Sequence, residues 1–96
     1  MKTHNLKTDP QSFESSWNGD KPWEIRQDDR DFLPGHGVRL RETWFTGQQM
    51  RDGAPLAYTG REVFGRIGYI LDGPIYGLAE GWVVFTVTDQ IRSIAT

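Results

Sequence analysis

The stretch that decides the fold of this chain is GDKPWEIR, residues 19–26. Its last four residues alternate apolar and charged side chains, a pattern that predicts a half-buried β-strand. Successive side chains of a strand point to opposite faces, so Trp23 and Ile25 share one side. We expect that side to face the core, and we expect Glu24 and Arg26 on the opposite face.

A short helix is expected just before this strand. Asp9 followed by Pro10 is typical of a helix start, with Asp as the N-cap and Pro in the first helical position. The pair at 18–19, Asn-Gly, is typical of a helix end. Phe13 and Trp17 are four residues apart and share one helical face, so we assign both to the core.

Four more strands are predicted from apolar alternation or from β-branched and aromatic runs. They cover residues 1–6, 38–45, 61–71 and 82–88. Gly65 and Gly68 mark points where the strand over 61–71 bends. Trp23, Trp44 and Trp82 each fall on the apolar phase of a strand, and we assign them to the core.

The remaining segments are read as connections. Residues 46–57 are expected to form a long flexible connection, residues 72–81 a glycine-rich one, and residues 91–96 a C-terminal tail. One short helix and about five strands within 96 residues predict a single α+β domain over residues 1–90. The expected architecture is a small β-barrel with the helix covering one opening, because closure hides the sheet edges of so short a chain.

Composition excludes several classes of protein. The chain has no cysteine, which excludes disulfides, iron–sulfur clusters and thiol catalysis. His4 and His36 are not in a metal-ligand spacing, so we expect no metal and no cofactor. No apolar run is long enough to cross a bilayer, and the N-terminus shows no apolar signal region. We therefore expect a cytoplasmic protein, in the producing bacterium or in a host, with no membrane partner.

The net charge of the chain argues against non-specific electrostatic binding to duplex nucleic acid. The net charge is −2, whereas such binding needs several uncompensated cations. Eight of the 11 basic residues are arginines, and the planar guanidinium suits phosphate, carboxylate or base edges. The bias predicts the use of a few placed arginines rather than a diffuse positive field.

Lys21, Glu24 and Arg26 form the most informative charged group. They could line a polar pocket in which the two cations hold a phosphate or a base carbonyl while the carboxylate accepts from an amine. They could equally form an ion-pair network that fixes the strand to the helix end. Arg30 also allows two interpretations. It could be a solvated loop arginine, or it could fold over a ligand at the mouth of a cleft.

Other polar residues allow similar alternatives. Arg39 and Arg41 are same-face neighbours that could track a phosphate backbone, but we favour cross-strand pairing with Glu62. Tyr58 could stack on a base, although loop aromatics more often pack locally. His4 could act as a general base, yet a hydrogen-bonded structural role is favoured.

Several of these segments resemble one family. Residues 19–26 resemble the G-x-K-x-x-E-x-R signature of the ASCH superfamily, and they follow the first helix as they do in that family. The opening residues 4–7, HNLK, resemble the H-x-L-K of a small ASCH-like subfamily of phages and bacteria. The same frame continues in order at residues 29–32, 40–42, 58–62 and 77–84, so the resemblance covers about residues 2–87.

The resemblance implies a PUA-like fold with a cleft between helix and barrel. Members are thought to bind RNA or nucleotide-like ligands there, so we expect an RNA- or nucleotide-binding module. The cleft would be lined by six residues. They are Lys21, Glu24, Arg26, Arg30, Arg41 and Tyr58.

One branch of the superfamily consists of amidohydrolases that act on acylated cytidine, in which the signature lysine activates a hydroxyl three residues later. Here that position is Glu24, so we do not expect an enzyme of that branch. The alternative is a hydrolase of a modified nucleoside or RNA, with Lys21 as base or electrostatic stabiliser and Glu24 as general acid/base.

A third alternative is a phage-encoded protein that binds a host or defence protein. The 46–57 connection would then be the contact site. In each case we expect a monomer or a weak dimer.

Overall fold

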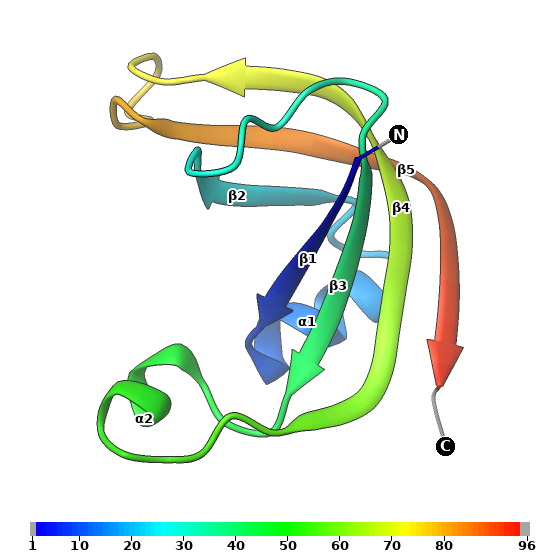
Figure 1. Cartoon of the computed structure of the whole chain (residues 1–96). Coiled ribbons are helices and arrows are strands. Elements are labelled where there is room, and N and C mark those ends of the chain that lie inside the picture. The colour runs from blue at the N-terminus through cyan, green and yellow to red at the C-terminus, as the bar shows by residue number, and fades with distance from the viewer. Residues whose placement is uncertain (1, 95–96) are drawn as a thin grey trace.

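Five strands form one strongly curled mixed sheet; helix α1 lies behind β1 and β3, and helix α2 lies at the lower left (Figure 1). The computed structural model describes residues 2–94. In chain order the elements are β1 (Thr3–Thr8), α1 (Pro10–Trp17), β2 (Trp23–Gln27), β3 (Gly37–Thr43), α2 (Gly47–Arg51), β4 (Tyr58–Asp72) and β5 (Trp82–Ile94). The strand order is β1-β3-β4-β5-β2.

The sheet is a half-barrel. β1 runs parallel to β3, and the other neighbouring pairs are antiparallel. The expected α+β class with about five strands is confirmed. The curl brings the edge strands β1 and β2 toward each other, but they do not pair, so the barrel stays open between them.

The curl is produced where β4 bends, as predicted. Its register against β5 shifts between Phe64 and Arg66 and again between Ile67 and Ile70, and a glycine lies in each interval. A Cβ atom on Gly65 would lie 2.3 Å from Val87 Cγ1, and one on Gly68 would lie 2.5 Å from Thr86 Oγ1. Only glycine lets the two strands approach so closely at the bends.

The hydrophobic core fills the concave side of the sheet. Leu6, Leu40 and Val63 occupy facing positions on β1, β3 and β4, and all are buried. Helix α1 adds Phe13, which is fully buried and packs against Trp17 at 6.0 Å between ring centroids. The helix is therefore stabilised by packing Phe13 and Trp17 against the core, as expected for so short a helix.

Three segments differ from the sequence expectation. The connection over 46–57 contains α2, whose capping box joins Thr46 and Gln49. β5 continues to Ile94, paired with Arg61 of β4, so residues 91–94 of the expected tail are strand. Residues 95 and 96 lie outside the described residues. Asp9 precedes α1 as expected, but its carboxylate accepts from Gly47 N at 3.0 Å instead of capping its own helix.

The assignment of three tryptophans to the core is wrong. Trp23 is 42% exposed, Trp44 63% and Trp82 40%. β2 is turned so that Glu24, paired in register with Phe85, faces inward. Trp44 lies beyond the end of β3, where alternation no longer fixes its direction.

Candidate functional site

A polar cleft lies along the open side of the half-barrel. A cavity of about 220 Å³ is lined by residues of β1, α1 and β2 together with Lys21. A second cavity of about 530 Å³ continues from it toward α2 and the loop that follows β2. Asp9, Ile25 and Arg26 line both, so the two cavities form one continuous cleft.

The buried carboxylate of Glu24 organises the first cavity. Its side chain is only 3% exposed. Oε2 accepts from Lys21 Nζ at 2.5 Å, and Oε1 accepts from Arg26 Nε at 3.0 Å and from Nη2 at 2.8 Å. Two cations from different segments, the α1–β2 loop and β2 itself, are therefore fixed against one anion.

Arg26 also spans the gap between the edge strands. Its Nη1 donates to Lys7 O at 3.1 Å, and its Nη2 donates to Thr8 Oγ1 at 3.2 Å. Farther along β1, Arg30 Nη1 donates to Asn5 O at 2.7 Å. These arginines satisfy carbonyls on the free edge of β1 that a neighbouring strand would otherwise bind.

Lys21 is held from three sides. Besides Glu24, its Nζ donates to Ser16 Oγ at 3.3 Å and lies 5.3 Å from the centre of the Trp23 ring. Its side chain is 13% exposed, and that of Arg26 is 24% exposed. The expectation that Glu24 lies on the face of β2 opposite the core is wrong, because its side chain is buried at the wall of the cleft.

Arg41 and Tyr58, two of the six residues expected in the cleft, lie elsewhere. The Arg41 guanidinium stacks 3.6 Å above the Tyr58 ring on the outer face of β3 and β4. Glu62 Oε2 accepts from Arg41 Nε at 3.1 Å and from Arg39 Nη2 at 2.6 Å. The favoured cross-strand pairing with Glu62 is therefore confirmed.

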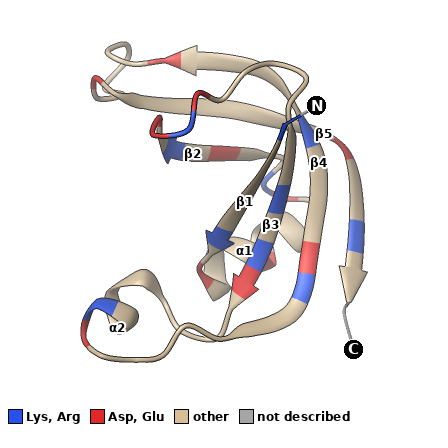
Figure 2. Ribbon diagram, viewed as in Figure 1, with Lys and Arg blue, Asp and Glu red and all other residues tan. Residues whose placement is uncertain are grey.

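The cleft also contains residues that the sequence did not single out. Lys7 and Asp9 line the first cavity, and Arg51 of α2 lines the second. In all, five basic side chains and three acidic ones line the two cavities, although the whole chain carries a net charge of −2. Figure 2 shows basic positions on β1, β2 and α2. Arg51 was missed because its segment has no apolar periodicity.

His4 is structural in this arrangement. It is 3% exposed, its Nε2 lies 3.0 Å from His36 Nδ1, and its ring packs on Phe32. Burial lowers the pKa of His4, and the neighbouring His36, Lys2 and Arg30 lower it further. The favoured hydrogen-bonded role is therefore what the geometry shows.

A second ionic cluster anchors α1 to the sheet. Arg61 of β4 donates to Glu42 of β3 and to Glu14 of α1, each at 2.8 Å, while it lies over the Phe13 and Trp17 rings. The hydrogen bond from Arg61 holds the pKa of Glu42 below its usual value despite burial. This cluster supports the cleft from outside without lining it.

The fold and the cleft define a small α+β half-barrel with a polar cavity at its open edge, an architecture compatible with a PUA-like fold. A family model described as "Domain of unknown function (DUF3850)" matches residues 3–87. The chain belongs to this family. A comparison with curated proteins finds no match. Within residues 2–94, no helix is long and apolar enough to span a membrane.

Proposed function

We propose that the cleft between β1, α1 and β2 binds RNA or a nucleotide-like small molecule. The observation that carries this proposal is the buried Glu24 carboxylate, which holds Lys21 and Arg26 in the cleft wall. A ligand that carries phosphate or base carbonyl groups is complementary to two fixed cations.

The two cations keep donors for a ligand. An ammonium has three N–H groups, and Lys21 uses one on Glu24 and one on Ser16. A guanidinium has five, and four of those of Arg26 are engaged by Glu24, Thr8 and Lys7 O. Each side chain therefore retains one N–H, already oriented by the bonds that the others make.

The second cavity suits the phosphate of the same ligand. Arg30 and Arg51 line it from opposite sides, the loop after β2 and helix α2. Arg51 is exposed, and the side chain of Arg30 is 41% exposed, so both are accessible. Planar guanidinium groups bind phosphate with two parallel hydrogen bonds.

The ASCH-like signature supports the same assignment. Its lysine, glutamate and arginine correspond to Lys21, Glu24 and Arg26, the three side chains that meet in the first cavity. The curled half-barrel is compatible with the PUA-like fold that this resemblance implies.

The geometry favours binding over hydrolysis. The Glu24 carboxylate has about four acceptor sites and already uses three of them on cations, which leaves at most one for a proton taken from substrate or water. The carboxylate is therefore better placed to position Lys21 and Arg26 than to activate water.

Calorimetric titration tests the proposal. The probes are the four common nucleoside monophosphates and a single-stranded RNA of about eight nucleotides, a length typical of one binding fold. The test variant combines Arg30→Gln with Arg51→Gln, and the matched control is Arg66→Gln, because Arg66 lies on β4 outside the cleft. Loss of charge-assisted contacts should weaken binding about tenfold or more in the double variant only. Absence of binding to every probe, or an equal loss in the control, would contradict the proposal.

A further inference from the structure

A basic surface lies on the outer face of β1 and β3, on the side of the sheet away from the core. Leu6 of β1 and Leu40 of β3 are buried in the core. Because side chains alternate along a strand, the neighbours of these leucines point outward. Those neighbours include Lys7, Arg39 and Arg41, which we call the basic stripe. Lys7 pairs with Arg41 in register, and Figure 2 shows the basic positions of the two strands beside one another.

Most of the positive charge of the stripe is uncompensated. Glu62 of β4 pairs with Arg41 in register, and its Oε2 accepts from both arginines. It is the only acidic residue among the outward residues of β1, β3 and positions 62–66 of β4. One carboxylate therefore faces three cations. The stripe carries a local positive charge that attracts anions, although the net charge of the chain is −2.

Arg41 is held with a free donor edge. Its Nε donates to Glu62 Oε2 at 3.1 Å, and its guanidinium stacks 3.6 Å above the Tyr58 ring. Its two terminal nitrogens have no acceptor among the described residues 2–94. Both reach solvent, because Arg39 Nε is the only buried side-chain nitrogen without a partner in that part of the chain. A guanidinium oriented in this way can bind a phosphate through two parallel hydrogen bonds.

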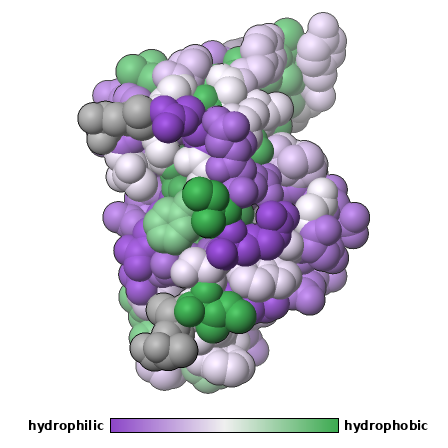
Figure 3. Space-filling model, turned by 90° about the vertical axis from the view of Figure 1, so that its right-hand side faces the viewer, coloured by the Kyte–Doolittle hydropathy of each residue, from purple (hydrophilic) through white to green (hydrophobic). Residues whose placement is uncertain are grey.

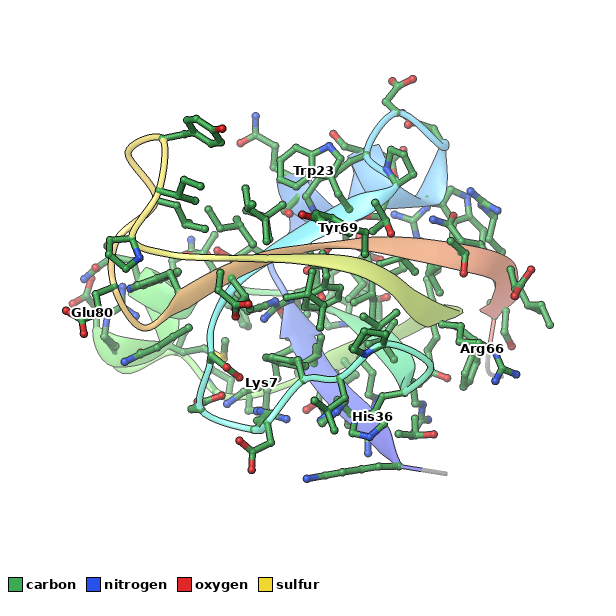
Figure 4. All side chains as sticks on the ribbon, turned by 90° about the horizontal axis from the view of Figure 1, so that it is seen from above. Lys7, Trp23, His36, Arg66, Tyr69 and Glu80 are labelled. Atoms are coloured by element: carbon green, nitrogen blue, oxygen red, sulfur yellow. The ribbon has the colours of Figure 1, made fainter. Side chains whose placement is uncertain are left out.

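Lys7 connects the stripe to the cleft. It lines the first cavity, and its ammonium has no hydrogen-bond or ion-pair partner within residues 2–94. Neighbouring strands lie about 4.8 Å apart, so Lys7 and Arg41 present their cations on adjacent strands. In Figure 4 Lys7 lies on the side of the molecule opposite Trp23 of β2. A chain that leaves the first cavity over β1 therefore meets Lys7 first and Arg41 next.

Apolar side chains continue the surface beyond the stripe. Phe64 of β4 is half-buried and pairs with Arg39 on one side and with Ile91 of β5 on the other. Ile91 is 66% exposed. Figure 3 shows that the side formed by β4 and the C-terminal half of β5 is largely hydrophilic with separate apolar groups. Single-stranded nucleic acids bind where cations contact phosphates and aromatic rings stack on bases.

We propose that the basic stripe binds the phosphates of a single-stranded RNA whose other part occupies the cleft. This inference rests on the proposed function of the cleft and names its ligand as a strand rather than a free nucleotide. A nucleotide confined to the cleft does not contact Arg41, which lines neither cavity. Two uncompensated charges suit a strand of a few nucleotides, whereas a duplex needs more cations. Continuity with the cleft through Lys7 favours this occupant over an acidic protein.

Calorimetric titration with RNA of increasing length tests the stripe. The probes are the four common nucleoside monophosphates and oligoribonucleotides of mixed sequence with about two, four and eight nucleotides, the last being a length typical of one binding fold. The full chain is used at several NaCl concentrations. We expect the affinity to rise about tenfold or more from the best mononucleotide to the longest RNA, because the longer strand adds charge-assisted contacts.

Two variants of Arg41 locate these contacts. Arg41→Gln removes the donor edge and leaves Glu62 paired with Arg39 at 2.6 Å. We expect it to weaken binding of the longest RNA about tenfold and to leave mononucleotide binding unchanged. The slope of log K against log [NaCl] should decrease in magnitude by about 0.7, the value of one phosphate contact on a single strand. Arg41→Lys keeps the charge but not the fork, so it should lose less affinity and retain the salt slope.

The matched control is Arg66→Gln. Arg66 is another outward arginine of β4, in register with Gly37 of β3, and it lies 4.0 Å from Asp89. We expect this variant to bind every probe as the parent protein does. Thermal unfolding of each variant verifies that the fold is retained.

The outcomes separate the stripe from the cleft. If the longest RNA binds no more tightly than the best mononucleotide, the stripe inference is overturned and the cleft proposal stands. An equal loss of RNA affinity in Arg41→Gln and Arg66→Gln would also overturn it, as would binding of a polyglutamate peptide that Arg41→Gln abolishes, which would assign the stripe to an acidic protein. RNA binding that depends on Arg41, without binding of any mononucleotide, would support the stripe and contradict the cleft proposal.

Discussion

Replacing Glu24 by glutamine should destabilise the protein far more than replacing a surface carboxylate. Glutamine has nearly the same shape, so packing is retained and only the charge is lost. The side chains of Glu24, Lys21 and Arg26 are 3%, 13% and 24% exposed. Removing one partner of a buried ion pair costs about 3–5 kcal/mol, because the other charge is left without compensation.

We expect a loss of about 3 kcal/mol, the lower end of that range. The glutamine oxygen still accepts one hydrogen bond, and Arg26 reaches some solvent. For a domain of this size, such a loss lowers Tm by roughly 12–24 °C. The matched control is Asp29→Asn, since Asp29 is 64% exposed and lies 3.5 Å from Arg30; an exposed pair contributes less than about 1 kcal/mol.

Urea denaturation followed by tryptophan fluorescence measures both variants. The comparison is made at neutral pH and at two salt concentrations, because a buried cluster is screened less than a surface pair. Equal stability of Glu24→Gln and Asp29→Asn would refute the argument. It would mean that the two cations are adequately solvated without the carboxylate, and that the network does not hold β1 and β2 together.

Three further predictions follow from other parts of the structure. Gly65→Ala should destabilise the protein by about 1–3 kcal/mol, because the new Cβ would lie 2.3 Å from Val87 Cγ1; an unchanged urea midpoint would show that the bend of β4 relaxes freely. Trp23→Ala, at a position 42% exposed, should cost much less than Phe85→Ala, for which about 3–5 kcal/mol is expected in the core, and comparable melting temperatures would place Trp23 in the core after all. Because burial lowers the pKa of His4, the imidazole binds a proton more readily in the unfolded chain than in the folded one, so the free energy of unfolding falls as the pH drops below about 6.5. Urea denaturation at about pH 7.5 and 5.5 should show a smaller fall in this free energy for His4→Gln than for the parent protein. An identical fall in both would assign the titration to another group.

Local sequence patterns predicted most of the elements and the site of bending. The helix ending at 17 and the strand over 23–27 lie where caps and alternation placed them. Gly65 and Gly68 marked the bends because no other residue permits the approach to β5. Helix α2 was also detectable, since Thr46 and Gln49 have the spacing of a capping box. The end of β5 was not, because Ile91 and Ile94 are exposed and give no core pattern.

The direction of β2 could not be predicted from its sequence. Alternation separates Trp23 from Glu24 but does not say which faces inward, and hydrophobicity alone favours the tryptophan. The outcome depends on Lys21 and Arg26, which supply the donors that the buried carboxylate needs, and on β1, where Lys7 O and Thr8 Oγ1 accept from Arg26. Lys21 and β1 lie outside the strand, so only the tertiary structure shows that Glu24 is satisfied.

The same limit applies to the site residues. Lys21, Glu24 and Arg26 lie close in sequence and meet in the cleft, whereas Arg41 and Tyr58 form a separate pair on the outer face of the sheet. Arg41 follows Leu40, which is buried, so alternation already directs its side chain away from the concave side. What the sequence lacks is the distance between β1 and β2, which determines the residues that line the cleft.

The gap between β1 and β2 explains why Lys21, Glu24 and Arg26 occupy a position where an apolar contact would be more stable. Replacing a buried ion pair by well-packed apolar residues is often neutral or stabilising, so stability alone gives no reason to retain three charges between β1 and β2. Direct pairing of the two strands would satisfy the β1 carbonyls that Arg26 and Arg30 now bind, but it would close the barrel and fill the cleft. Long side chains instead hold the edges apart at a fixed spacing and keep the cleft open. Ligand binding in this cleft, which we propose, is the function that would offset the cost in stability.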